Sequence, residues 1–369
     1  MAIRIEPLTK DLVPAVKEFN QRLEAGGCHA YQFPESEIPL WLPRIENRRI
    51  YQEYFAAVED GSVRGAYILK HQEFSFRGRI LSIGFFHLPI SEGIVNRAYG
   101  GLGLRLLLDA LRRQPYLFAL GMGGYDEPLP KLLKGLRWNL FAVPFYFKVV
   151  HPARFLRNIQ FLRNTRLRRL AMDVLAASGL GWLGIKTAHA FLRRTRRPAG
   201  VEVVDEFGAW ADELWNRCQT SYGMAAVRDC TVLNILYPRE NRRFIRVRIS
   251  QGGRVQGWAV LLNTLMSDHK YFGNLRLGSI VDCLAAPEDA APVIAGATAA
   301  LQRLGVDLVV SNQSHAAWCA ALKASGFIEG PSNFLFAASE KLSQLLSPFE
   351  ANKPQLHLNR GDGDGPIHL

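Results

Sequence analysis

The feature that most constrains the fold of this 369-residue chain is a repeat, because one order of strands and helices is predicted twice along it. Each copy has a strand, a helix, a hairpin continued by a third strand, a helix, a strand, a helix and a closing strand. The copies lie within residues 1–150 and 201–345. They share little sequence, so the repeat is one of pattern. Alternating strands and helices predict an α/β protein with mixed sheets and two domains.

Local sequence signals predict these elements in both copies. In the first copy, Asp60-Gly61 is typical of a hairpin turn, and the apolar run over residues 79–89 predicts a strand. Leucines at helical spacing predict a helix over residues 100–113. In the second copy, Gly252-Gly253 is the corresponding turn. The closing strands of the two copies are predicted at residues 142–150 and 333–338.

The net charge of the chain is concentrated in the segment between the two copies. The chain carries a formal charge of +12, and residues 151–200 contain eleven Lys or Arg and one acid, Asp173. This segment therefore holds ten of the charges, and the rest of the chain carries only +2. The charge pattern therefore does not imply a nucleic-acid-binding surface over the whole protein, whereas a local anionic partner fits it.

We expect residues 151–200 to be a basic amphipathic helical linker, and its role stays open. It could be a helical arm packed on the domains, with its arginines in solvent. Residues 153–197 could instead lie on an anionic membrane surface, where Trp182 and Phe191 would be buried in lipid. A spanning helix is disfavoured by Lys186 and His189 within the apolar run. Nucleic-acid binding is disfavoured by the lack of a known motif.

The cysteines and the last residues bear on compartment and order. The chain has five Cys, and none has the spacing of a zinc site, so we expect no metal. An odd number of Cys without a secretory signal favours a reducing cytoplasm. Residues 346–369 are rich in Gly, Asp and Pro, which predicts a disordered tail.

One stretch carries a resemblance to a known family. Residues 81–111, LSIGFFHLPISEGIVNRAYGGLGLRLLLDAL, resemble the strand, loop and helix with which the GNAT (GCN5-related N-acetyltransferase) family binds the pyrophosphate of coenzyme A. Gly101 and Gly103 fall on the two Gly positions of the family motif Q/R-x-x-G-x-G/A. Ala98 stands where Gln or Arg is usual, and Arg97 is displaced by one position.

Further stretches extend the resemblance over nearly all of each copy, to residues 3–150 and 201–341. Residues 306–330 resemble the strand, Asn, helix and Gly-Phe ending of the family, with Asn312 and Gly326-Phe327 at the usual positions. Residues 284–296 of the second copy lack the G-x-G pattern. The resemblance therefore implies two tandem GNAT-like domains, with the acyl-CoA site in the first.

The resemblance implies which residues would contact an acyl-CoA, with acetyl-CoA as the first candidate. Glycines let a backbone approach phosphate oxygens, and the N-terminus of a helix favours an anion. The strand before the loop would supply backbone contacts to the acyl group. The expected contact residues are Phe86, His87, Leu88, Arg97, Gly100, Gly101, Gly103 and Leu104.

Acyl transfer to an amine also needs acid–base groups. His87 is a candidate base because His titrates near neutral pH, although a hydrogen-bonded core His has the same pattern. Glu73 could be a base or a solvated acid, and Tyr125 an acid or a packing residue. Asp282 interrupts an apolar strand, which indicates either a functional group or a buried salt bridge. The Tyr acid of many family members falls at Leu133 and Leu322, so it is not carried over.

These expectations favour one function and leave two alternatives. The favoured function is that of an acyl-CoA-dependent N-acyltransferase acting on an amine, such as an amino sugar or a lipid-linked envelope precursor. It would be cytoplasmic, and peripheral at the inner face of the membrane if residues 153–197 bind there. The alternatives are a Fem-type transferase that uses aminoacyl-tRNA, and a non-catalytic GNAT-derived binding or scaffold protein.

Overall fold

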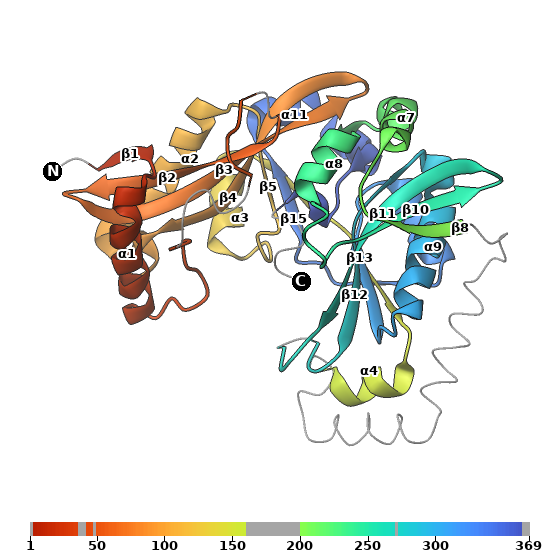
Figure 1. The fold of residues 1–369 in the computed structure, drawn as a ribbon. Helices are drawn as coiled ribbons and strands as arrows, with labels where there is room; N and C mark the ends of the chain where they lie inside the picture. Colours follow the sequence, from red (N-terminus) through yellow and green to blue (C-terminus); the bar gives the residue numbers. More distant parts are fainter. Residues whose placement is uncertain (1–2, 36–41, 47–48, 160–199, 270–271, 364–369) are drawn as a thin grey trace. The chain divides into compact units, whose positions relative to one another are not determined.

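A computed structural model describes residues 3–35, 42–46, 49–159, 200–269 and 272–363. It confirms the prediction of a mixed α/β protein with two mixed sheets. The chain divides into two compact units, each of which is described separately (Figure 1). Unit 1 comprises residues 1–75, 79–142 and 335–352, and unit 2 comprises residues 76–78, 143–334 and 353–369.

Unit 1 is built on a sheet with the strand order β1-β2-β3-β4-β5-β15-β6. The helices are α1 (Val13–Ala25), α2 (Leu102–Arg113), α3 (Pro128–Gly135), α11 (Glu340–Leu345) and α12 (Phe349–Asn352). The strands are β1 (Arg4–Pro7), β2 (Tyr51–Glu59), β3 (Ser62–Phe76), β4 (Arg79–Ser91), β5 (Leu117–Leu120), β6 (Asn139–Ala142) and β15 (Leu335–Ala338).

Alternation along β3 explains how unit 1 forms a core on both faces of its sheet. Tyr67 and Leu69 pack in the cluster that includes the leucines of α2. Ala66 and Ile68 pack in the cluster that includes the apolar face of α1. Successive side chains of a strand point to opposite faces, so a strand buried on both sides reads as a continuous apolar run.

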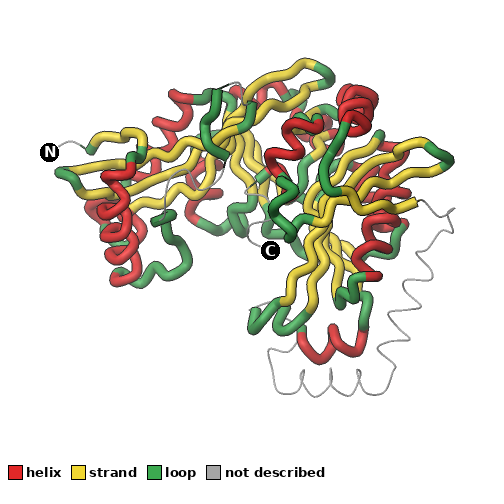
Figure 2. Tube along the Cα trace, viewed as in Figure 1, coloured by secondary structure: helices red, strands yellow, loops and turns green. Residues whose placement is uncertain are grey.

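Unit 2 has a second mixed sheet, with the order β14-β7-β13-β12-β11-β10-β8, and α9 packs on it (Figures 1 and 2). Its helices include α4 (Pro152–Asn158), α7 (Ala209–Cys218), α8 (Cys230–Leu236), α9 (Ala290–Arg303) and α10 (Ala316–Ala324). The sheet strands are β7 (Phe145–Val149), β8 (Gly200–Val204), β10 (Ile245–Gln251), β11 (Arg254–Leu265), β12 (Arg276–Ala285), β13 (Leu308–Asn312) and β14 (Ile328–Gly330).

The closing strand of each half of the sequence belongs to the unit formed by the other half. β15 lies between β5 and β6, antiparallel to both, whereas β7 lies between β13 and β14. The units therefore differ from the predicted ranges 1–150 and 201–345. The pattern of one strand cannot show which sheet accepts it, because either sheet offers the same unpaired backbone groups.

Two further predictions are corrected by the structure. The strand predicted at residues 142–150 begins only at Phe145, as β7, and a separate strand, β6, ends at Ala142, because Pro144 between them has no N–H for a sheet ladder. The tail predicted to be disordered at residues 346–369 is folded as far as residue 363. It forms α12, the short strand β16 (Leu356–His357) and a final 3-10 turn, Arg360–Asp362.

The basic linker falls mostly outside the described residues. Only α4 and the first residue of β8 lie within the predicted range 151–200, and residues 160–199 are not described. In the described part of the chain, no helix combines the length and apolar character that crossing a membrane would require.

Candidate acyl-CoA site

The two central strands of unit 1 separate beside the predicted contact residues. β4 and β5 are parallel partners at two positions, Gly84 with Leu117 and Phe85 with Phe118. β4 then continues to Ser91, while the last residue of β5, Leu120, pairs with β15. Leu88 of β4 has a φ of +46°, a conformation that a branched side chain rarely adopts. The backbone around Leu88 is therefore turned out of a regular ladder.

The three residues of β4 that are predicted to contact the acyl-CoA differ in which of their atoms are accessible beside this separation. The side chain of Phe86 is 2% exposed and packs with the ring of Tyr67 in the core, so only its backbone could reach a ligand. His87 and Leu88 are half-buried. The His87 ring lies 5.1 Å from the ring of Phe85. Of the three residues, His87 is thus the one with a partly accessible titratable side chain.

The Gly-rich turn lies at the N-terminus of α2, as predicted. Gly101 is the N-cap residue, and no side chain caps the helix. The first N–H groups of a helix have no acceptor within it. Among the described residues, the backbone N–H groups of Gly101 to Leu104 have no hydrogen-bond acceptor.

Space around this turn is open. A Cβ built on Gly101 would meet no atom within 4 Å, and Gly100 and Gly101 are both exposed. Arg97 and Leu104 are also exposed on either side of the turn. Backbone N–H groups at the positive end of a 12-residue helix can bind a phosphate anion. The residues present therefore fit the diphosphate group of a CoA.

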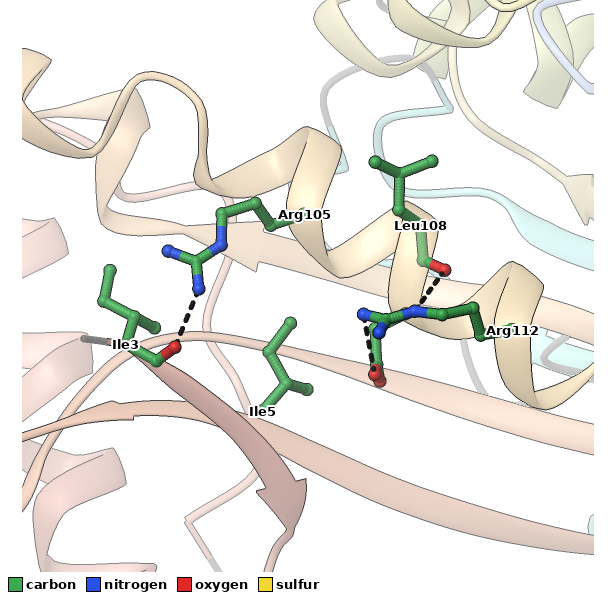
Figure 3. A pocket seen from close by; sticks show the side chains of 6 residues that line it. Ile3, Ile5, Arg105, Leu108 and Arg112 are labelled. Atoms are coloured by element: carbon green, nitrogen blue, oxygen red, sulfur yellow. Dashed lines mark hydrogen bonds and ion pairs between the residues drawn. The ribbon is translucent and has the colours of Figure 1, made fainter.

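A separate pocket of about 300 Å³ lies on the side of α2 that faces β1 (Figure 3). Arg105 donates a hydrogen bond of 2.7 Å from Nη2 to the carbonyl oxygen of Ile3 there. The strand order places β1 three strands away from β4, so this pocket is not at the β4–β5 separation. The lining residues are Ile3, Ile5, Arg105, Leu108, Asp109 and Arg112.

The other predicted catalytic groups of unit 1 have different surroundings. Glu73 is on β3, with its Oε2 atom 3.6 Å from Nη1 of Arg49. That oxygen is buried and makes no hydrogen bond within the described residues. Tyr125 is 51% exposed in the connection between β5 and α3. Leu133, a leucine and so not an acid, is fully buried in the core.

Asp282 in unit 2 is the centre of a buried ion pair. Its Oδ2 atom accepts hydrogen bonds from Nε of Arg228 at 2.8 Å and from the hydroxyl of Tyr237 at 2.7 Å. Its Oδ1 atom accepts one from Nδ2 of Asn359 at 2.9 Å. Nη2 of Arg228 donates to Asp362 at 2.7 Å. Of the two interpretations of Asp282, the structure therefore supports the salt bridge.

The charges of this ion pair also act on its neighbours. Burial and the Asp282 carboxylate raise the pKa of Tyr237 well above its usual value, so its hydroxyl keeps its proton. Burial opposes the charged form of Arg228, but Asp282 and Asp362 outweigh it and raise the pKa of the guanidinium. The sequence does not single out Arg228, Asn359 or Asp362 as partners of Asp282, although Asn-x-x-Asp at 359–362 is a capping signal.

In unit 2 the C-terminal segment occupies the corresponding strand separation. β12 and β13 are parallel partners from Leu277 with Leu308 to Ile280 with Ser311. Beyond them, the N–H of Ser314 donates to the carbonyl of Leu358 at 3.1 Å. A Cβ on Gly361 would lie 2.6 Å from Oδ2 of Asp282. Residues 356–362 therefore fill the space at the ends of these two strands.

Comparisons with known proteins agree with this fold. No family model matches the chain, and no curated protein matches it by sequence. Saccharomyces cerevisiae N-myristoyltransferase, solved with myristoyl-CoA and inhibitors bound, superposes with a TM-score of 0.51 at 10% identity, covering 91% of this chain and 79% of that one. A GCN5-related N-acetyltransferase from Anabaena variabilis gives 0.50 at 10% identity, covering 91% and 72%.

These likenesses define the class of fold. The chain has the GNAT fold, as the stretch at residues 81–111 predicts. The strand separation and the turn at Gly101 lie where that resemblance places the acyl-CoA. At 10% identity the likeness extends to the fold alone. No group of three or more side chains suited to a metal occurs among the described residues.

Proposed function

We propose that the chain is an acyl-CoA-dependent N-acyltransferase whose acyl-CoA site lies in unit 1. The observation that carries the proposal is the separation of β4 from β5 next to an exposed, uncapped helix N-terminus. The acyl-pantetheine arm would enter at the separation, with the diphosphate on the N–H groups of Gly101 to Leu104. Acetyl-CoA is the first candidate donor.

The chemistry follows from this placement. The amine nitrogen attacks the thioester carbonyl carbon, the C–S bond breaks, and CoA leaves as a thiolate that takes up a proton. A backbone N–H near Leu88 would polarise the carbonyl, because its φ of +46° turns the peptide out of the ladder. His87 would accept the proton of the amine. Glu73 remains a second candidate base, and Tyr125 a candidate acid for the thiolate.

Unit 2 has the character of a supporting domain in this proposal. Its strand separation is filled by residues 356–362 and by the buried pair of Asp282 and Arg228. It also lacks the exposed Gly-rich turn, since α9 follows the 3-10 turn Pro287–Asp289. A scaffold role therefore fits unit 2, while unit 1 keeps the features of a donor site.

The acceptor and the location are proposed from the sequence. An amino sugar or a lipid-linked amine of the cell envelope would suit a protein whose basic segment, 153–197, binds the inner face of a membrane. Vesicle flotation with anionic and neutral lipids tests the proposed membrane binding independently of activity.

To test the activity, the release of free CoA thiol from acetyl-CoA and from longer acyl-CoAs is measured in the presence of a panel of amines. We expect amine-dependent release that His87→Gln slows by about 100-fold or more. CoA binding without turnover by any amine would favour the scaffold alternative. Absence of CoA binding, combined with binding of aminoacyl-tRNA, would favour the Fem-type alternative.

A further inference from the structure

The loop that leads from β4 to the Gly-rich turn is held by four charged side chains and one tyrosine. We call this group the Tyr99 cluster; its members are Arg22, Glu59, Arg64, Glu92 and Tyr99. Glu92, at the start of the loop, is 4% exposed. Its Oε2 atom lies 3.1 Å from Nη2 of Arg22 and 3.2 Å from Nη1 of Arg64.

The end of the loop is attached to the same group. The Tyr99 hydroxyl donates a 2.7 Å hydrogen bond to Oε2 of Glu59, the last residue of β2. Nε of Arg64 donates to the same oxygen at 3.2 Å. The Arg64 guanidinium also lies 5.0 Å from the centre of the Tyr99 ring. Arg64 therefore links the two ends of the loop, through Glu92 and Glu59.

Close backbone packing restricts the same loop. A Cβ on Gly93 would lie 2.4 Å from the carbonyl oxygen of Tyr99, so this position requires glycine. A Cβ on Gly26, after α1, would lie 2.4 Å from Cβ of Val95. Steric contact and ion pairing thus act on the loop together.

The charges of the Tyr99 cluster balance. Its two carboxylates face its two guanidinium groups, so Arg22 and Arg64 are engaged within the cluster. The Tyr99 hydrogen bond lowers the pKa of the Glu59 carboxyl, and the same bond raises the pKa of Tyr99. The two groups therefore keep the protonation states that the hydrogen bond needs at neutral pH. The cluster therefore has no free positive charge for an anion, whose recognition falls to the backbone N–H groups of the turn and to the exposed Arg97 beside it.

We infer that the Tyr99 cluster consists of positioning residues, which fix the loop so that the N–H groups of Gly101 to Leu104 meet the diphosphate of CoA. This inference rests on the proposed function. Loss of one member should weaken contacts to the diphosphate and leave contacts to the pantetheine arm unchanged.

The test compares Tyr99→Phe and Glu59→Gln with the wild type and with Tyr31→Phe, a control at a 49% exposed tyrosine of the same unit. We expect both cluster variants to bind CoA about tenfold more weakly, as for loss of a hydrogen bond to a charged group. Binding of S-acetylpantetheine, which has no diphosphate, should stay within about twofold by ligand-detected NMR. Hydrogen exchange of amides 93–104 should become faster in Tyr99→Phe and Glu59→Gln but not in Tyr31→Phe.

Each outcome has a distinct meaning. Unchanged CoA affinity, or an equal loss for CoA and S-acetylpantetheine, would overturn the positioning role. A folded wild type that does not bind CoA would refute the proposed function instead. In that case the exchange rates still decide whether the Tyr99 cluster holds the loop, because unchanged rates in Tyr99→Phe and Glu59→Gln would overturn the inference.

Discussion

The side-chain amide of Asn359 donates a 2.9 Å hydrogen bond to Asp282, a residue 77 positions earlier in the chain. Asp282 is fully buried and also accepts a bond from Arg228. This contact ties the last described residues of the chain to the centre of the unit 2 sheet. It explains why a tail with the composition of a disordered segment is folded.

Asp282→Ala should destabilise the protein without affecting the donor site. Removing one partner of a buried ion pair typically costs about 3 kcal/mol or more. Asp282→Ala leaves Nε of Arg228, the Tyr237 hydroxyl and the Asn359 amide buried without this acceptor. We expect that loss in the free energy of unfolding by urea, and unchanged CoA affinity. Glu240→Ala, at an exposed acid, should change stability by less than about 0.5 kcal/mol. A stable Asp282→Ala protein without turnover would restore a catalytic role.

His315 should make unit 2 sensitive to mild acid. Burial lowers its pKa from 6.5 to about 4, and burial also lowers the pKa of His357 well below the usual value. The unfolded chain takes up a proton near pH 6.5 while the folded chain does so near pH 4. Stability is therefore fully present above pH 6.5 and is lost as the pH falls from 6.5 towards 4.

Urea unfolding between pH 7 and pH 5 measures this loss, at about 1.4 kcal/mol per pH unit for each such histidine. Nδ1 of His315 accepts a hydrogen bond from the N–H of Ala317 and so caps α10. Asn is a good N-cap, so His315→Asn should keep the cap and flatten the pH profile. An equally steep profile in that variant would show that His315 is not the titrating group.

Gly93→Ala should damage the loop more than the fold. Its Cβ would overlap the carbonyl oxygen of Tyr99 at 2.4 Å, so the loop must shift. We expect CoA affinity to fall by about tenfold or more, an estimate based on one lost charged hydrogen bond. Gly135→Ala, at the exposed end of α3, is the matched control, because its Cβ meets no atom within 4 Å and it lies outside the proposed site. Equal affinities for the two variants would contradict the proposed placement of the diphosphate.

His87→Gln should lower kcat and leave the KM for acyl-CoA nearly unchanged. General-base catalysis contributes about 100-fold or more, and the half-buried His87 is the candidate base. Steady-state kinetics with an active amine acceptor measures both constants. A variant with unchanged kcat would move the role to another group, and Glu73→Gln would then be the next variant to measure.

The part of the fold that could be predicted is the part encoded by local sequence patterns. The apolar run before the loop and the leucines after Gly103 define β4 and α2, because strand and helix periodicities differ. The exchange of β7 and β15 could not be predicted in this way. Pairing of a strand with a sheet depends on contacts with distant residues, which no local pattern records.

The candidate site could likewise be predicted only in part. Gly101 and Gly103 stand at the N-terminus of α2, where the family motif places them. The Tyr99 cluster joins α1, the β2–β3 hairpin and the loop, so its members are distant in sequence and carry no shared signal. Asp282 stands out in the sequence as a charge in an apolar strand, but its partner Arg228 lies 54 residues earlier in the chain.

Calorimetric titration of the folded protein with CoA tests the central claim most directly. The wild type should bind, and Gly101→Glu should lose binding, because a carboxylate would meet the diphosphate at the turn. Gly101→Gln is the isosteric control, and it should retain more affinity than Gly101→Glu if charge is the cause. A folded wild type that does not bind CoA, or a Gly101→Glu variant that binds as tightly as the wild type, would contradict an acyl-CoA site in unit 1.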